Sequence, residues 1–172
     1  MNFNRLYFLF FLSILSLTIS GQEYIVLPNN QTLEVNIIYQ IQGKDSIKIA
    51  KYLNDSIAYR YKIYKGKISG VYQCYYPNGQ LYIRGIYMNG LRHGEWKNFD
   101  NKGVLTLTGQ YLYDKKAGSW YDFQNGRVEM YREGEARGRW RIDEGWTPRT
   151  LFRYRKGILV KVKRHPYNAD AL

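Results

Sequence analysis

The chain has 172 residues, with 26 Lys or Arg against 14 Asp or Glu, for a net charge of +12. One cysteine, Cys74, excludes an intrachain disulfide, and two histidines leave little material for a metal site or a catalytic base. Eighteen tyrosines and only four prolines are typical of an ordered chain, and the length suits a single domain.

Residues 1–21 have the organisation of a secretory signal peptide. Arg5 supplies the charged start, residues 6–19 form an apolar run, and the small residues Ser20 and Gly21 follow. The run is shorter than the ~20 residues that a spanning helix needs, so we expect a signal helix that is cleaved after Ser20 or Gly21. A retained membrane anchor is the alternative. Cleavage would leave a soluble protein, exported to the periplasm or the outside of the cell.

A 24-residue repeat occupies most of the remaining chain. Its columns are Leu33, Ile57, Leu81 and Leu105; Val35, Tyr59, Ile83 and Leu107; and Tyr39, Ile63, Tyr87 and Tyr111. Between turn signals such as Asn89-Gly90 the sequence alternates with period two, which predicts two strands in each unit. A fixed period of this length is the signature of a repeat array. We therefore expect an all-β fold, an elongated antiparallel meander of stacked β-hairpins.

Glycines and aromatics recur at fixed places in each unit. Gly85 and Gly109 fall inside predicted strands, where a large ring on the next strand can cover the bare backbone. Gly70, Gly94 and Gly118 are expected to open the strand that follows a turn. The residues that define the repeat are Tyr72, Gly85, Gly94, Trp96, Gly109, Tyr111, Gly118, Trp120 and Trp140. The aromatic column is either a packing spine or an exposed stacking platform, and the small core of a single sheet favours the spine.

The repeat changes along the chain. Residues 22–69 keep the apolar columns and lose most glycines, so they are read as degenerate hairpins. Residues 70–146 carry the regular units, and the last of these is four residues shorter, which places Trp140 where Trp120 stood. Residues 147–172 are predicted to form a basic hairpin and tail.

The basic segment is a candidate surface for an anionic partner. From Arg137 to His165 the chain has ten basic and two acidic residues, a net charge of +8. The candidate residues are Arg149, Arg153, Arg155, Lys156, Lys161, Lys163 and Arg164. A turn at Lys156-Gly157 would place Arg155 opposite Ile158 and Arg153 opposite Val160. Arg153 and Arg155 would then share one face, with Lys161 and Lys163 on the other. The alternative role of these charges is to protect an edge strand from aggregation.

Three segments resemble MORN repeats: "GVYQCYYPNGQLYIRGIYMNG", "GEWKNFDNKGVLTLTGQY" and "GSWYDFQNGR". They are most similar to the bacterial variant found in YwqK-type antitoxin-like proteins, where "YYPNGQL" and Gly-x-Trp segments alternate. The resemblance covers about residues 70–146. It implies a meander of hairpins that serves binding or scaffolding, and it supplies no shared catalytic residues.

No nucleophile motif or metal-ligand spacing occurs, and His93 is read as a solvated turn residue. We therefore expect no enzyme activity, no catalytic residues, no cofactor and no bound metal. The sequence favours an exported interaction or scaffold module of the cell envelope, with a protein partner and an anionic lipid or polymer surface. An exported protein meets such surfaces more readily than nucleic acid. The alternative is an antitoxin-like or immunity protein that binds one toxin.

Overall fold

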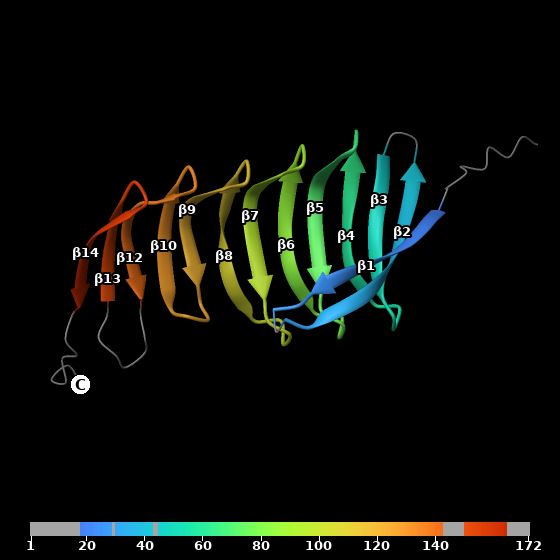
Figure 1. Cartoon of the computed structure of the whole chain (residues 1–172), viewed down its shortest axis with the longest axis horizontal. Coiled ribbons are helices and arrows are strands. Elements are labelled where there is room, and N and C mark those ends of the chain that lie inside the picture. The colour runs from blue at the N-terminus through green and yellow to red at the C-terminus, as the bar shows by residue number, and fades with distance from the viewer. Residues whose placement is uncertain (1–17, 29, 43–44, 143–149, 165–172) are drawn as a thin grey trace, which may run out of the picture.

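The computed structural model describes residues 18–28, 30–42, 45–142 and 150–164, and they form one long antiparallel sheet (Figure 1). The strands are β1 (Thr18–Val26), β2 (Thr32–Gln42), β3 (Asp45–Tyr52), β4 (Ile57–Tyr64), β5 (Lys67–Tyr75), β6 (Leu81–Met88), β7 (Leu91–Phe99), β8 (Leu105–Leu112), β9 (Lys115–Asp122), β10 (Arg127–Arg132), β11 (Glu135–Ala136), β12 (Gly138–Ile142), β13 (Thr150–Arg155) and β14 (Ile158–Arg164). Apart from the short β11, which pairs with β10, the strands follow one another in chain order, and the sheet is not closed. The predicted all-β meander is confirmed.

Most of the expected signal segment lies outside the described residues. Its last part, residues 18–21, belongs to β1. The signal helix expected in residues 1–17 therefore stays a prediction. Within the described ranges there is no helix of the length and apolarity needed to cross a bilayer.

Five connections along one edge of the meander are two-residue turns of the same kind. Both central residues have positive φ at Lys65-Gly66, Asn89-Gly90, Tyr113-Asp114, Glu133-Gly134 and Lys156-Gly157. Such turns match the right-handed twist of the flanking strands, and Asn and Gly tolerate the backbone angles best. The predicted turns at Asn89-Gly90 and Lys156-Gly157 are confirmed.

The glycines expected to open strands lie instead inside them. Gly70, Gly94 and Gly118 are each the fourth residue of their strand, with φ of 83°, 69° and 64°. The prediction was wrong because the preceding turns take only two residues, so the strands begin earlier. At each of these glycines the register with the preceding strand shifts, and the positive φ is what a β-bulge requires.

The loops at the opposite edge are joined to each other by side chains. The hydroxyl of Tyr52 donates to the carbonyl of Tyr75 at 2.7 Å, and that of Tyr76 donates to the carbonyl of Phe99 at 2.9 Å. These contacts repeat at the 24-residue period. Asp100 occupies the next position of this column, and its carboxylate instead accepts from the backbone of its own loop.

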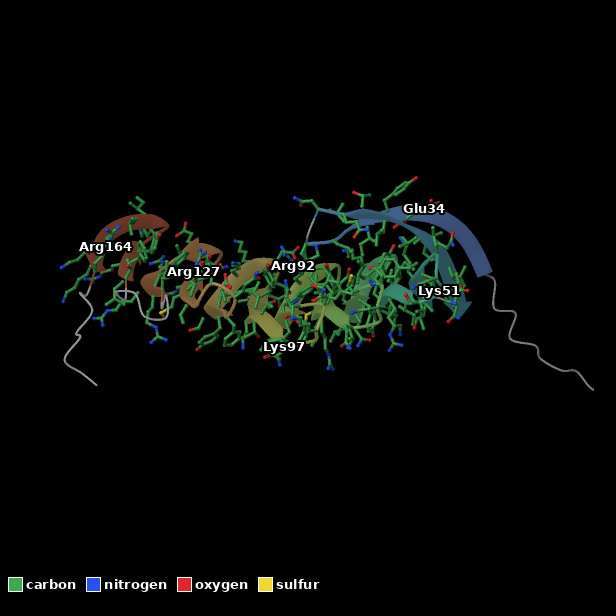
Figure 2. All side chains as sticks on the ribbon, turned by 90° about the horizontal axis from the view of Figure 1, so that it is seen from below. Glu34, Lys51, Arg92, Lys97, Arg127 and Arg164 are labelled. Atoms are coloured by element: carbon green, nitrogen blue, oxygen red, sulfur yellow. The ribbon has the colours of Figure 1, made fainter. Side chains whose placement is uncertain are left out.

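The N-terminal hairpin does not continue flat beside β3. β1 and the first part of β2 cross one face of the sheet, which we call the front face (Figure 1), and they form a second layer there (Figure 2). The core lies beneath this layer and consists of Val35, Ile37, Ala50, Tyr52, Ala58, Tyr59 and Cys74. The rest of the sheet has a single layer, so its stability depends on contacts between side chains along each face.

Candidate interaction surfaces

A row of aromatic side chains runs along the front face from β4 to β13, and we call it the aromatic row. Its members are Tyr59, Tyr61, Tyr72, Tyr87, Trp96, Tyr111, Trp120, Tyr131, Trp140 and Tyr154. Trp96 and Trp120 both meet the ring of Tyr111 edge to face, with centroids 5.7 and 4.9 Å away. The two tryptophans therefore share one face of the sheet, as the 24-residue period predicts.

The tryptophans are fixed by the same contact in each unit. The indole nitrogens of Trp96, Trp120 and Trp140 donate to the backbone carbonyl ten residues earlier, at 3.3, 3.1 and 3.1 Å. Trp96 is 8% exposed and Trp120 is 3% exposed. Rings this deeply covered cannot stack on a ligand, so this part of the row packs the sheet.

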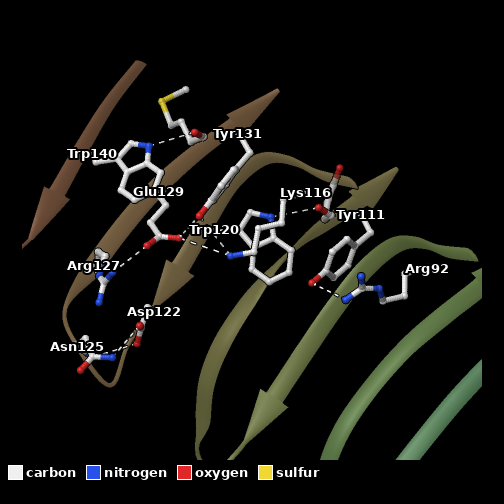
Figure 3. A network of polar contacts seen from close by, with 12 residues as sticks. Arg92, Tyr111, Lys116, Trp120, Asp122, Asn125, Arg127, Glu129, Tyr131 and Trp140 are labelled. Carbon is white, nitrogen blue, oxygen red and sulfur yellow. Dashed lines mark hydrogen bonds and ion pairs between the residues drawn. The ribbon is translucent and has the colours of Figure 1, made fainter. Parts of the chain in front are cut away.

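Cations fill the gaps between the rings (Figure 3). The ammonium of Lys116 lies 4.5 Å from the ring of Trp120 and 4.6 Å from that of Tyr131. Glu129 stands opposite Trp120 and accepts a hydrogen bond from the Tyr131 hydroxyl at 2.8 Å. It also lies 3.6 Å from Lys116 and 3.1 Å from Arg127. The front face is therefore charged but internally paired, which leaves little net attraction for an external anion.

A second ion pair docks the N-terminal hairpin onto the sheet. Glu23 of β1 accepts from the Lys48 ammonium at 2.5 Å and from the Tyr59 hydroxyl at 2.7 Å. These hydrogen bonds hold the pKa of Glu23 below its ordinary value. The pKa of Lys48 is raised, because its bonds to Glu23 and Tyr59 outweigh the largest single effect, burial, which lowers it. A buried cation needs such a partner, so the pair fixes where β1 crosses the sheet.

On the other face of the sheet, the back face, three cations of the last three strands form no ion pair with any described residue. Arg139 of β12 stands opposite Arg153 of β13, and Arg153 stands opposite Lys161 of β14. Among the described residues of these strands none is acidic. Like charges directly across a ladder destabilise it, so this row is held together against its own repulsion.

This register corrects part of the expected hairpin. Arg155 pairs with Ile158 as predicted, but Arg153 pairs with Lys161 rather than with Val160. The cause is a bulge in β14 that takes up one extra residue between Leu159 and Lys161. Arg153 and Lys161 therefore share the back face, with Lys163 two residues further along the strand, and the charges gather on one face instead of flanking the hairpin.

The remaining candidate residues surround this row. Arg155, Lys156 and Arg164 are exposed at the two ends of β13 and β14, whereas Arg149 lies outside the described residues. All seven residues of β14 are exposed. We call Arg139, Arg153, Lys161 and Lys163 the basic row.

A hollow that sequence reasoning missed opens beside the tip of the N-terminal hairpin. Its volume is about 600 Å³, and it lies between Leu27, Pro28 and Gln31 of the tip and the ends of β5 to β9. The hairpin tip approaches these strands only in the folded chain, across 45 or more residues of sequence. The aromatic and amide residues that recur in the loops are visible in the sequence. The 24-residue period does not indicate that the hairpin tip lies against them.

His93 was expected in a turn and lies inside β7 instead, with its ring 4.9 Å from that of Tyr113. Its Nδ1 is buried and has no hydrogen-bond partner among the described residues. Over those residues, no group of three or more His, Cys, Asp or Glu side chains is arranged to hold a metal ion. Comparison of the chain with protein-family models and with curated proteins returned no match.

Proposed function

We propose that the protein is an exported, non-enzymatic interaction module of the cell envelope, which holds a protein partner near an anionic surface of lipid or polymer. The observation that carries the proposal is the basic row, in which Arg139, Arg153 and Lys161 lie side by side without an acidic neighbour on their strands. A polyanion would relieve the repulsion within the row. Diffuse contacts of this kind supply attraction rather than specific recognition.

The MORN resemblance supports a binding or scaffolding role. In the Gly-x-Trp segments, Gly94 and Gly118 adopt positive φ and the following Trp96 and Trp120 cover the glycines of the preceding strand. The Gly-x-Trp motif therefore has a structural role, and it places no requirement on the residues at the exposed positions of each unit. A MORN-type scaffold would present such positions to partners.

Export rests on the signal-like segment at residues 1–21. Cleavage after Ser20 or Gly21 would shorten β1 but retain Glu23, which docks the hairpin onto Lys48. The fold would therefore survive processing. Amino-terminal sequencing of the protein from envelope and secreted fractions should give a start at Gly21 or Gln22, and a start at Met1 in both fractions would contradict export with cleavage.

Co-sedimentation with vesicles tests the charge-based tether. The parent protein should sediment with anionic phosphatidylglycerol vesicles and not with neutral phosphatidylcholine vesicles. The bound fraction should fall steeply towards 0.15 M salt, where exposed charges are screened within ~8 Å. The variant Arg153→Glu/Lys161→Glu/Lys163→Glu should lose this binding.

A matched control separates position from net charge. The variant Lys65→Glu/Arg84→Glu/Lys102→Glu changes the net charge equally at exposed sites far from the basic row. It should retain more binding than the basic-row variant. Equal sedimentation of the parent and the basic-row variant would refute the tether and leave edge protection as the role of these charges.

One observation favours the alternative, an antitoxin-like protein that binds a single toxin. Among the described strands β14 pairs with β13 alone, and its apolar residues Ile158, Leu159, Val160 and Val162 are 46–67% exposed. An edge of this kind can accept a strand from another protein. Capture of one stoichiometric partner from envelope extract, lost on Val160→Pro, would support this alternative.

A further inference from the structure

The hollow at the hairpin tip has the size and lining of a ligand site. Its volume of about 600 Å³ falls within the ~300–1,000 Å³ range of small-molecule pockets. One wall is the tip of the β1–β2 hairpin, and the other is built from the loops and strand ends of β5 to β9. Because the two walls come from different layers, the hollow exists only where the hairpin crosses the front face.

Aromatic rings form the apolar part of the lining. Tyr76 and Tyr82 lie with centroids 4.9 Å apart, and Phe99 lines the hollow beside them. Tyr82 is the extra residue of a bulge between β5 and β6, and Thr106 is the extra residue of the equivalent bulge between β7 and β8. A bulge re-aims a side chain, and both of these residues line the hollow.

Amides and carboxylates form the polar part. Asp100 accepts from the backbone nitrogens of Lys102 and Val104, and Asp122 is bonded to Asn125. These two carboxylates are therefore held in place by their own loops.

The side chains of Asn98 and Gln124 differ, since they form no hydrogen bond to any described residue. Each offers both a donor and an acceptor to a ligand.

The charge of the lining narrows the ligand class. Among the described residues, no Lys or Arg lines the hollow, although the chain has a net charge of +12, and two carboxylates do. An anionic ligand would meet Asp100 and Asp122 without a compensating cation. A neutral ligand with an apolar face and a rim of hydroxyl groups matches the rings, the amides and the carboxylates together.

We propose that the hollow binds an uncharged saccharide unit. One face of the sugar ring packs on the rings of Tyr76 and Tyr82, and its hydroxyl groups exchange hydrogen bonds with Asn98 and Gln124. Asp100 and Asp122 accept from further hydroxyls at the rim. The site is separate from the basic row and from its proposed anionic partner. A test can therefore refute saccharide binding without refuting the charge-based tether, and the reverse also holds.

Saturation-transfer NMR and titration calorimetry with cellotriose, maltotriose and triacetylchitotriose test the proposal on the full-length protein. At least one of these neutral oligosaccharides should bind, and glucuronic acid, in which a carboxylate replaces the hydroxymethyl group of glucose, should not. Failure of all three neutral probes would overturn the proposal. Binding of the cationic probe spermidine in their place would overturn it too, because the carboxylates would then define the site.

Two variants place the binding in the hollow. Asn98→Ala/Gln124→Ala removes two side chains without a structural partner and should weaken binding about tenfold or more, as expected for two lost hydrogen bonds. Gln110→Ala, an exposed amide of β8 that does not line the hollow, should leave binding unchanged. Gln124→Ala alone, in an exposed loop, repeats the test with the least risk to folding. Unchanged affinity in both Asn98→Ala/Gln124→Ala and Gln124→Ala would overturn the assignment.

Discussion

Trp120 occupies the space that a side chain at position 109 would need. A β-carbon built on Gly109 lies 2.1 Å from Cδ2 of Trp120, and one built on Gly85 lies 2.3 Å from the equivalent atom of Trp96. Neither glycine has a positive φ, so the requirement for glycine comes from the ring rather than from the backbone.

Gly109→Ala should therefore destabilise the protein by about 1–3 kcal/mol, the usual cost of overpacking. At a strand glycine without this contact, substitution by alanine would instead stabilise the protein, because alanine restricts the unfolded chain. Urea unfolding of Gly109→Ala, Trp120→Ala and the double variant measures the effect. The cost of Gly109→Ala should shrink when Trp120 is absent, and additive costs would show that the ring is not the cause.

Trp120→Ala should cost about 3–5 kcal/mol, because the indole is almost fully buried and its loss leaves a cavity against Gly109 and Lys116. Trp140 is more exposed and has Glu129 at the position corresponding to Gly109, so Trp140→Ala should cost less. Tyr121→Ala, on the back face and 43% exposed, is the control and should cost least. A cost for Trp120→Ala equal to that of the control would contradict the packing role of the aromatic row.

The Glu23–Lys48 contact should make the hairpin sensitive to acid. The pKa of Glu23 is lower in the folded than in the unfolded protein, so its contribution is present above the ordinary value of 4.5 and is lost as the pH falls through the folded pKa. Glu23→Gln should lower the urea midpoint at pH 7, and the difference from the parent should shrink below pH 4.5. Glu34→Gln on the neighbouring strand is the control. A pH-independent difference would show that the charge of Glu23 is not involved.

Cys74 should be unreactive in the folded protein. Burial raises the pKa of this thiol to about 11, and the side chain is 2% exposed, so almost no thiolate is present or accessible at pH 8. Ellman's reagent should therefore react only after urea unfolding. A fast reaction under native conditions would mean that the core beneath the hairpin opens readily.

Much of the fold could be read from the sequence because strand parity and side-chain faces are local properties. The period places Trp96 and Trp120 over Gly85 and Gly109, and this arrangement is what the structure has. The pairing of Arg155 with Ile158 was likewise predictable, since a two-residue turn sets the first pair of a hairpin.

The features that escaped prediction have two physical causes. A bulge inserts one residue and reverses the faces of the residues beyond it, and no break in the residue pattern of β14 marks its position, so strict alternation paired Arg153 with Val160 instead of Lys161. Contacts between the two layers do not repeat along the sequence, so the 24-residue period cannot predict them. The approach of Glu23 to Lys48, and the hollow that the hairpin tip forms with the loops, depend on how β1 and β2 bend across the sheet.

The strict neighbour-to-neighbour order of the strands makes the molecule a spacer of adjustable length. The hairpin-tip hollow lies near β5 to β9, and the basic row lies on β12 to β14. Each inserted 24-residue unit between them would add two strands and move the two surfaces apart by about 10 Å, while the even residue count keeps every side chain on its face. The number of repeats thus determines how far apart this scaffold holds whatever its two ends bind.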